Sequence, residues 1–229
     1  MADQKRGARL LAEAVVIVVS ILLAFWIDAS WESRQARAAE RRLLESIRTE
    51  TAANRVNLDV TIATNRGDLE RFSRFLAASP DELQRLPQDS VALWLGSIVI
   101  AWTYDGDHSA TGLLLDSFTP VTAQGRRVRN LAARWVRVLE DAGEEKATLW
   151  DLGTRLTARL APLAVPAAEA GQGFVHQIAA RRGPSVLADL RRDSDFVAAA
   201  LDKTHYQNIY LIELDQASGV LDSLQSAIR

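Results

Sequence analysis

The longest apolar run of the chain lies near the N-terminus, from residue 10 to residue 27. It reads LLAEAVVIVVSILLAFWI and contains one charged residue, Glu13. As an α-helix the run extends roughly 27 Å, close to the roughly 30 Å hydrocarbon core of a bilayer. Trp26 and Trp31 lie at its far end, where indole rings favour the headgroup level. The pattern predicts one transmembrane helix over 10–27, preceded by a short tail of residues 1–9.

The residues after the run distinguish it from a cleaved signal peptide. No small-x-small cleavage site precedes a break, and the chain passes directly into the strongly helical WESRQARAAERRLL, which predicts an uncleaved anchor. Basic residues flank the run on both sides, so a simple Lys/Arg count does not fix its orientation. The opposite orientation would carry three basic side chains and the terminal amine of residues 1–9 across the membrane. We therefore expect a protein of the bacterial inner membrane with a cytoplasmic N-terminus and a periplasmic bulk.

Two polar residues lie inside the expected span. Glu13 follows Arg9 by one turn, which favours an interfacial carboxylate that pairs with Arg9 or extends toward the lipid headgroups. The alternative is a hydrogen bond from Glu13 to a neighbouring transmembrane helix, since ionisable groups at membrane depth usually face protein. Ser20 is small enough to allow close helix approach. The candidates for contact with lipid or a partner are therefore Glu13, Ser20, Trp26 and Trp31.

A stalk helix is expected over residues 28–79. No proline occurs between the anchor and Pro80, and the helical phase continues across Gly67, so we expect one unbroken or slightly bent helix. Its inward stripe comprises Leu44, Ile47, Thr51, Asn54, Leu58, Ile62, Asn65, Leu69, Phe72 and Leu76. Asn54 and Asn65 lie within this stripe, where a buried asparagine can fix the register of paired helices. The alternative is a solvated position at the stripe edge.

Residues 80–229 are expected to form a helical domain, which a capping-box sequence opens. The charge-free run from 91 to 104 spans roughly 21 Å as a helix, too short to cross a membrane comfortably. We interpret it as a buried core helix. In an alternative interpretation it docks on the membrane or on a partner, because Trp94 and Trp102 bracket it as interfacial residues do.

The remaining elements are separated by proline- and glycine-containing breaks. The segment DGDH at 105–108 lacks the further oxygen ligands of a calcium loop and is interpreted as a plain loop. Separate helices are expected through 128–139 and 149–160, and the Ala-, Pro- and Gly-rich segment 162–184 as a mobile or partner-docking loop. A last helix, from about 195 to 229, would pack back on the stalk. The sequence therefore predicts an all-α fold with an antiparallel helical bundle.

Composition narrows the function classes. A formal net charge of −2 does not favour binding to nucleic acid, and the absence of cysteine excludes disulfides, thiolate metal sites and cysteine nucleophiles. The three histidines lack the spacing of a metal site, and there is no phosphate-binding loop, nucleophile elbow or dinucleotide motif. We expect no enzyme activity, no cofactor and no metal.

Several segments carry a resemblance to a known family. EAVVIVVSILLAFWIDASWE and ETAANRVNLD, and more loosely SATGLLLDSF, NLAARWVRVLED and LADLRRDSDFVAAAL, resemble an uncharacterised bacterial family of single-pass, membrane-anchored helical proteins, a domain of unknown function. The chain departs from that pattern at Ser20, where a glycine is common, and at Ser30, where an asparagine is common. The resemblance implies a topology and a helical content, and it implies no activity.

These patterns together favour an accessory or scaffold subunit. The anchor would pack in a larger bacterial membrane complex, respiratory or photosynthetic, and the helical domain would brace that complex, so the expected partners are membrane lipid and other membrane-protein subunits. Two alternatives remain. One is a periplasmic ligand-sensing or signalling module with a pocket near 162–184, and the other is a homo-oligomeric pore lined by Glu13 and Ser20.

Overall fold

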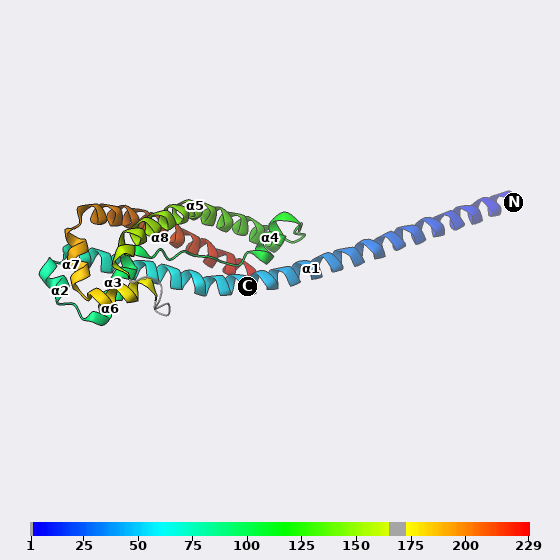
Figure 1. Ribbon diagram of the computed structural model, residues 1–229. Helices are drawn as coiled ribbons and strands as arrows, with labels where there is room; N and C mark the ends of the chain where they lie inside the picture. The colour runs from blue at the N-terminus through cyan, green and yellow to red at the C-terminus, as the bar shows by residue number, and fades with distance from the viewer. Residues whose placement is uncertain (1, 165–172) are drawn as a thin grey trace.

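One helix, α1 (Ala2–Ala77), runs through the stalk region and out of the folded body (Figure 1). The computed structural model describes the backbone of residues 2–164 and 173–229, and the side chains of residues 17–164 and 173–229. The helix continues across Gly67, which confirms the expectation of an unbroken rod there. Its N-terminal half projects away from the bundle, and its C-terminal half is part of the bundle (Figure 1).

Two further long helices, α5 (Ala123–Leu160) and α8 (Ser194–Ile228), complete the bundle: α8 packs beside α1 on one side and beside α5 on the other. In Figure 1, α8 runs antiparallel to both, and the C-terminus ends beside α1 at the point where α1 leaves the bundle. Apolar side chains at helical spacing meet between the three helices because each helix buries one stripe. This first core contains Ile47, Leu58, Val128, Trp135, Tyr210, Leu214 and Leu221.

Short helices gather at the end of the bundle farthest from the N-terminus. They are α2 (Pro80–Gln84), α3 (Gln88–Val99), α6 (Phe174–Arg182) and α7 (Ser185–Arg192). Their apolar side chains form a second core with Phe72, Phe75, Leu156 and Phe196 of the long helices. A further helix, α4 (Ser109–Asp116), and a 3-10 turn, Ala161–Leu163, complete the described elements. The expected all-α fold with bundle packing is confirmed, and no strand occurs in the described part of the chain.

The helices expected separately at 128–139 and 149–160 are one helix, and that prediction was wrong. Between Pro120 and Pro162 the sequence contains no proline, and a helix tolerates a glycine such as Gly143 at a cost of about 1 kcal/mol. The apolar stripe continues past Gly143, from the buried Ala142 to the buried Leu149.

The core helix expected over 91–104 is shorter than predicted. It ends at Val99, and the backbone from Ile100 to the start of α4 is not helical. Asparagine side chains on α1 hold this segment: Asn54 Nδ2 donates to the Asp107 carbonyl over 2.6 Å, and Asn65 Nδ2 donates to the Trp102 carbonyl over 2.9 Å. Both asparagines are buried, so they are not solvated. Both bind the connecting segment, and Asn65 Oδ1 also accepts from Gln207 Nε2 of the neighbouring helix over 2.9 Å.

The segment 162–184, expected to be a loop, contains α6. Val175 and Ile178 of that helix are buried in the second core, because they lie one turn apart on the same face. Gly183 ends the helix with a positive φ of 57°, a conformation that glycine adopts without strain. Residues 165–172 of the expected loop lie outside the described residues.

Two buried glutamates on α1 bind the N-termini of other helices. Glu40 accepts hydrogen bonds from the backbone N–H groups of Val121 and Thr122 (2.7 and 3.1 Å) and from the Thr122 hydroxyl, at the start of α5. Glu50 accepts from the N–H groups of Ala110 and Thr111 at the start of α4 (2.6 and 3.3 Å), and from the Thr111 hydroxyl. A carboxylate is favoured at a helix N-terminus because it satisfies free N–H groups at the positive end of the helix dipole.

A third polar cluster lies where α1, α3 and α8 meet. Lys203 is buried, and its ammonium donates to the Ser97 carbonyl (3.3 Å) and to Gln207 Oε1 (3.0 Å). Burial lowers the pKa of Lys203 to about 8, and the negative charge of Asp68 opposes that shift. Asp68 in turn pairs with Arg71 at 2.6 Å. The cluster joins three helices, and hydrogen bonds to the Lys203 ammonium and to Asp68 Oδ1 offset part of the cost of burying these charges.

The transmembrane helix expected over 10–27 is not found. Among the residues whose side chains are described, no helix contains a stretch long and apolar enough to cross a bilayer. The first part of that expected span, and the tail of residues 1–9, lie outside the residues whose side chains are described.

Candidate functional site

Residues 17–27 of α1 expose large apolar side chains around the whole circumference of the helix. Between residues 17 and 27, nine such side chains are each at least half exposed: Ile17, Val18, Val19, Ile21, Leu22, Leu23, Phe25, Trp26 and Ile27. Because successive helical residues are rotated by about 100°, nearly consecutive apolar positions leave no polar face. We call residues 17–31 the apolar segment; it ends at Trp31, which is 69% exposed.

The residues singled out in the sequence are divided between two separate places. Ser20, Trp26 and Trp31 are exposed on the apolar segment, whereas the side chain of Glu13 lies outside the described residues. Trp94 is half-buried against the second core, and Trp102 lies on the connecting segment after α3 and is 48% exposed. Trp94 and Trp102 therefore do not bracket one helix.

Trp102 belongs to an apolar surface patch that sequence reasoning missed. Two adjoining surface pockets meet at Ile100: Leu93 and Trp102 line one of them, of about 280 Å³, and Trp150 lines the other, of about 260 Å³. We call Leu93, Ile100, Trp102 and Trp150 the tryptophan patch. Trp150 is 68% exposed, although it follows the buried Leu149 in the sequence. The helical periodicity of the sequence places Trp150 outside the buried stripe of α5, and this periodicity could have identified it as an exposed tryptophan.

Gly153 allows the close packing beneath this patch. A side chain at Gly153 would approach the Val99 carbonyl to 2.8 Å, so α5 can meet the end of α3 only with glycine at that position. The patch is therefore supported by backbone of two elements rather than by flexible side chains.

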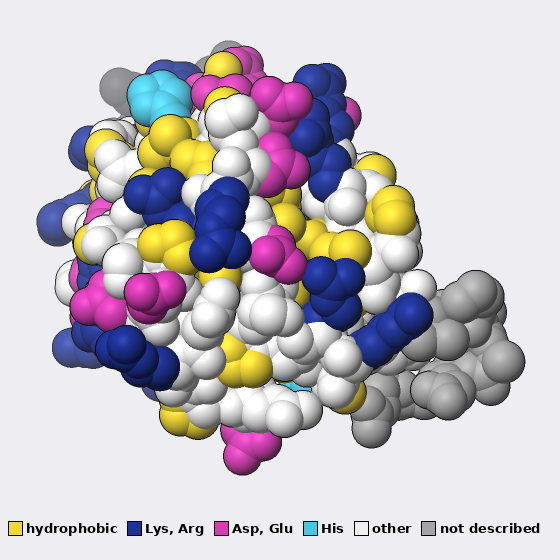
Figure 2. Space-filling model, turned by 60° about the vertical axis from the view of Figure 1, so that its left-hand side comes forward, with side chains coloured by type: hydrophobic (Ala, Val, Ile, Leu, Met, Phe, Trp, Pro, Cys, Tyr) yellow, Lys and Arg dark blue, Asp and Glu magenta, His cyan; other side chains and the backbone are white. Residues whose placement is uncertain are grey.

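Charged side chains elsewhere are of mixed sign. Figure 2 shows the end of the bundle farthest from the N-terminus, where Lys and Arg side chains alternate with Asp and Glu. This face offers no field of a single sign that would steer a polyanion toward it.

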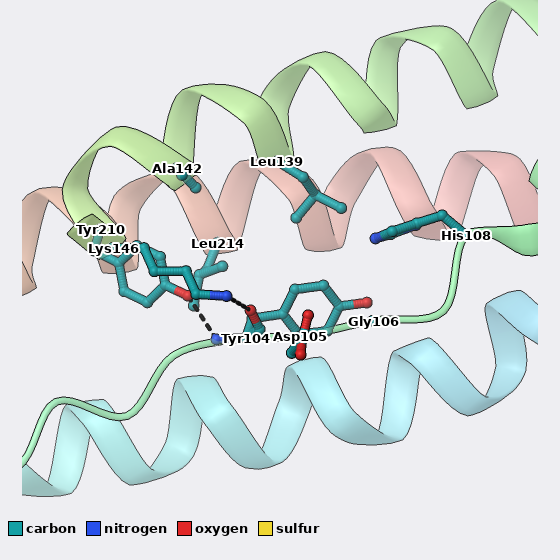
Figure 3. A pocket seen from close by; sticks show the side chains of 10 residues that line it. Tyr104, Asp105, Gly106, His108, Leu139, Ala142, Lys146, Tyr210 and Leu214 are labelled. Carbon is teal, nitrogen blue, oxygen red and sulfur yellow. Dashed lines mark hydrogen bonds between the residues drawn. The ribbon is translucent and has the colours of Figure 1, made fainter. Parts of the chain in front are cut away.

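A cavity of about 180 Å³ lies inside the bundle, between α5, α8 and the segment after α3 (Figure 3). Apolar walls come from Leu139, Ala142 and Leu214, and polar groups come from Tyr104, Asp105, His108, Lys146 and Tyr210. The backbone N–H of Tyr104 donates to the Tyr210 hydroxyl over 2.7 Å, and the Lys146 ammonium donates to the Tyr104 carbonyl over a longer 3.4 Å. These bonds fix the tyrosine on the cavity floor.

Two buried polar atoms at this cavity have no hydrogen-bond partner among the described residues. They are the Tyr104 hydroxyl and His108 Nδ1. Tyr104 is only 6% exposed, and burial, with the negative charge of Glu50, raises the pKa of its hydroxyl, which therefore stays protonated. Gly106 is required here, because a side chain at that position would collide with the Tyr104 hydroxyl.

A pair of carboxyl groups joins α5 to α8 through Glu145 and Glu213. Burial, a hydrogen bond with Glu145 and the nearby acidic side chains raise the pKa of Glu213 to about 7. A proton shared between two carboxyl groups makes such a contact possible, since two adjacent carboxylates would repel one another.

No protein-family model, curated protein or solved structure matches the chain. The family resemblance noted in the sequence therefore stays a prediction.

Proposed function

We propose that this protein is a non-catalytic accessory subunit, anchored in the bacterial inner membrane by the N-terminal part of α1 and bound to a larger membrane complex. The observation that carries the proposal is the apolar segment. A helix that is apolar on every side is stable only where its whole circumference is removed from water, which lipid provides.

The ends of the apolar segment support the choice of lipid. Trp26 and Trp31, both exposed, lie where the apolar run gives way to charged residues, and indole rings favour the membrane–water boundary. Asp28 lies between the two tryptophans, and Glu32 and Arg34 follow Trp31. Along the helix the side chains change from apolar to aromatic to charged, just as the environment across half a bilayer changes from hydrocarbon to headgroups to water.

The continuous helix would act as a spacer. The buried face of the bundle begins near Glu40, so residues 32–39 hold the bundle roughly 12 Å from the end of the apolar segment at 1.5 Å per residue. Because α1 passes into the bundle without a break, the position of the bundle relative to the anchor is fixed. A brace between membrane and partner requires such a rigid connection.

The tryptophan patch is the surface we assign to the partner. Exposed tryptophan and aliphatic side chains around two adjoining pockets resemble the energetic centre of a protein interface. We expect the partner to be an integral membrane protein that inserts an apolar helix or loop of its periplasmic side between Trp102 and Trp150.

Fractionation of cells that express the full chain tests the anchor. We expect the protein in the membrane pellet, retained after an alkaline carbonate wash and released by detergent. Recovery of the intact chain in the soluble fraction would overturn the proposal.

Co-purification in mild detergent tests the accessory role separately. Wild-type protein should elute with an integral membrane protein in fixed stoichiometry, and the double variant Trp102→Ser, Trp150→Ser should lose that partner while staying in the membrane fraction. Val56→Ser, which removes an equally exposed apolar side chain from α1, is the matched control. Equal recovery of the partner by both variants would exclude the patch as the interface.

A further inference from the structure

We propose that the cavity between α5, α8 and residues 104–108 binds a small monocarboxylic acid with an apolar body. This goes beyond the proposed function, which does not involve the cavity. The ligand class follows from three properties of the cavity: its volume, the placement of its unpartnered polar groups, and its charges.

The volume sets the size of the ligand. A cavity of about 150 Å³ accommodates benzene. The present cavity, at about 180 Å³, therefore suits a body of that size with a small polar substituent. Leu139, Ala142 and Leu214 provide the apolar walls that such a body requires.

The polar groups lie at the two ends of the Tyr104 ring. In Figure 3 the Tyr104 hydroxyl points toward His108, while the Lys146 ammonium lies at the other end, beside the Tyr104 carbonyl. The edge contact between His108 and Trp135, with ring centroids 4.9 Å apart, holds the imidazole in place. Burying unpartnered polar atoms costs free energy, so atoms kept in this state at a cavity indicate a group that satisfies them.

Among the described residues that line the cavity Lys146 is the one lysine or arginine, and it can bind a carboxylate at its end. Lys146 forms no ion pair among the described residues, and its one hydrogen bond is long. The Tyr210 hydroxyl accepts the Tyr104 N–H, which leaves its own proton free to donate to a ligand oxygen. An ammonium and a hydroxyl proton together recognise a carboxylate.

The acidic side chains around the cavity limit the ligand to a single negative charge. Asp105 lies at the rim, and Asp141, Glu144 and Glu145 lie on α5 near Lys146. A second carboxylate on the ligand would meet these groups and be repelled. At the end of the cavity opposite Lys146, a hydroxyl on the ligand can form hydrogen bonds with the Tyr104 hydroxyl and with His108 Nδ1.

Calorimetric titration of the detergent-solubilised full chain tests the site with four probes: benzoate, 4-hydroxybenzoate, benzyl alcohol and benzylamine. We expect benzoate to bind at least tenfold more tightly than benzyl alcohol or benzylamine, and 4-hydroxybenzoate to bind more tightly still. Equal affinities, tighter binding of benzylamine, or no binding of benzoate at millimolar concentration would overturn the proposal.

Two variants assign the ends of the ligand. Lys146→Met should lower benzoate affinity at least tenfold and leave benzyl alcohol unchanged, whereas Arg137→Met, which removes an exposed charge from the same helix, should change neither. Tyr104→Phe should remove the preference for 4-hydroxybenzoate over benzoate, and it should raise the melting temperature of the ligand-free protein because a buried unpartnered hydroxyl is lost. A preference that survives Tyr104→Phe would contradict the assignment of the far end.

Discussion

The two halves of α1 have the same backbone conformation and opposite relations to solvent. From residue 40 to residue 77 the helix buries its apolar stripe and also buries polar side chains, four of which (Glu40, Glu50, Asn54 and Asn65) bind another element. From residue 17 to residue 31 it exposes apolar side chains on every side. A helical backbone therefore does not show whether a segment lies in a protein core or elsewhere. The side chains show that one half of α1 packs in the bundle and that the other half is apolar on its exposed surface.

The difference also shows what specifies the bundle. Apolar stripes bring α1, α5 and α8 together, but apolar contacts alone tolerate sliding. Glu40, Glu50, Asn54 and Asn65 each bind a defined backbone group of another segment. They fix the positions of α5, α4 and the connecting segment along α1, and the apolar segment has no equivalent.

Among the polar contacts of the bundle half, the largest effect is expected where Glu40 binds the start of α5. Glu40→Ala leaves the N–H groups of Val121 and Thr122 without their acceptor, and Gly125→Ala forces a methyl group into the Glu40 carboxylate. Each change should lower the free energy of unfolding by about 2–4 kcal/mol. Urea unfolding of the full chain in detergent, followed by circular dichroism, measures it.

Acid unfolding gives an independent check of the same contact. Burial alone would raise the pKa of Glu40, but the hydrogen bonds from Thr122 and Val121 outweigh it and lower the pKa. A carboxyl whose pKa is lowered by folding stabilises the protein above its unfolded pKa of about 4.3, and this stabilisation is lost as the pH falls through the folded pKa. Glu40→Gln should flatten that acid dependence. Glu70→Gln, at an exposed carboxylate on the same helix, should not.

A somewhat smaller effect is expected at Asn65. Its amide donates to the Trp102 carbonyl and its Oδ1 accepts from Gln207 Nε2, both over 2.9 Å, so Asn65→Ala leaves two buried groups unpaired. The loss should be about 1–3 kcal/mol, with faster amide hydrogen exchange in residues 100–108. The exposed Asn57, which binds the Asp105 carbonyl, is the matched control. Equal losses from Asn57→Ala and Asn65→Ala would show that burial of the amide is not the cause.

The sequence predicts those features that depend on local periodicity. The apolar stripe of α1 and its continuity across Gly67 follow from spacing alone. The end of α3 does not, because the residues after Val99 are as apolar as those before it, and the side chains that hold the extended backbone are Asn54 and Asn65, far away in the sequence. The partners of Glu40 and Glu50 are hidden for the same reason.

The candidate functional residues also differ in whether the sequence alone could identify them. Trp26 and Trp31 could be proposed from their position after an apolar run. Trp150 and the cavity around Tyr104 could not, because each depends on elements that meet only in the folded chain.

A moderate effect that depends on pH is expected at Glu213. Because folding raises its pKa to about 7, the folded protein retains a proton that the unfolded chain releases above about pH 4.3. Stability should therefore fall as the pH rises from about 4.3 to 7 and level off above that window. Glu213→Gln should remove this dependence and stabilise the protein at pH 8 by about 1 kcal/mol, after allowance for solvent screening. Asp215→Asn, on the same helix, should leave the dependence unchanged.

Substitutions in the apolar segment should have the smallest effect on the stability of the bundle. They should have the greatest effect on whether the protein is found in the membrane pellet or in the soluble fraction. Leu22, Phe25 and Trp26 are each more than 60% exposed and belong to neither core. Replacing all three by glutamine should therefore change the free energy of unfolding of the bundle by less than about 0.5 kcal/mol. The same change should move the protein from the membrane pellet to the soluble fraction, because amide side chains are costly to bury in lipid.

Leu58→Gln provides the reverse case for the same helix. Leu58 is fully buried in the first core, so this variant should unfold the bundle while the apolar segment remains intact. Thermal unfolding and fractionation of both variants, measured in parallel, separate the two halves of α1. If the triple glutamine variant unfolded the bundle as Leu58→Gln does, the apolar segment would be part of the folded core. The two halves of α1 would then not differ in environment, and the argument for a membrane anchor would fail.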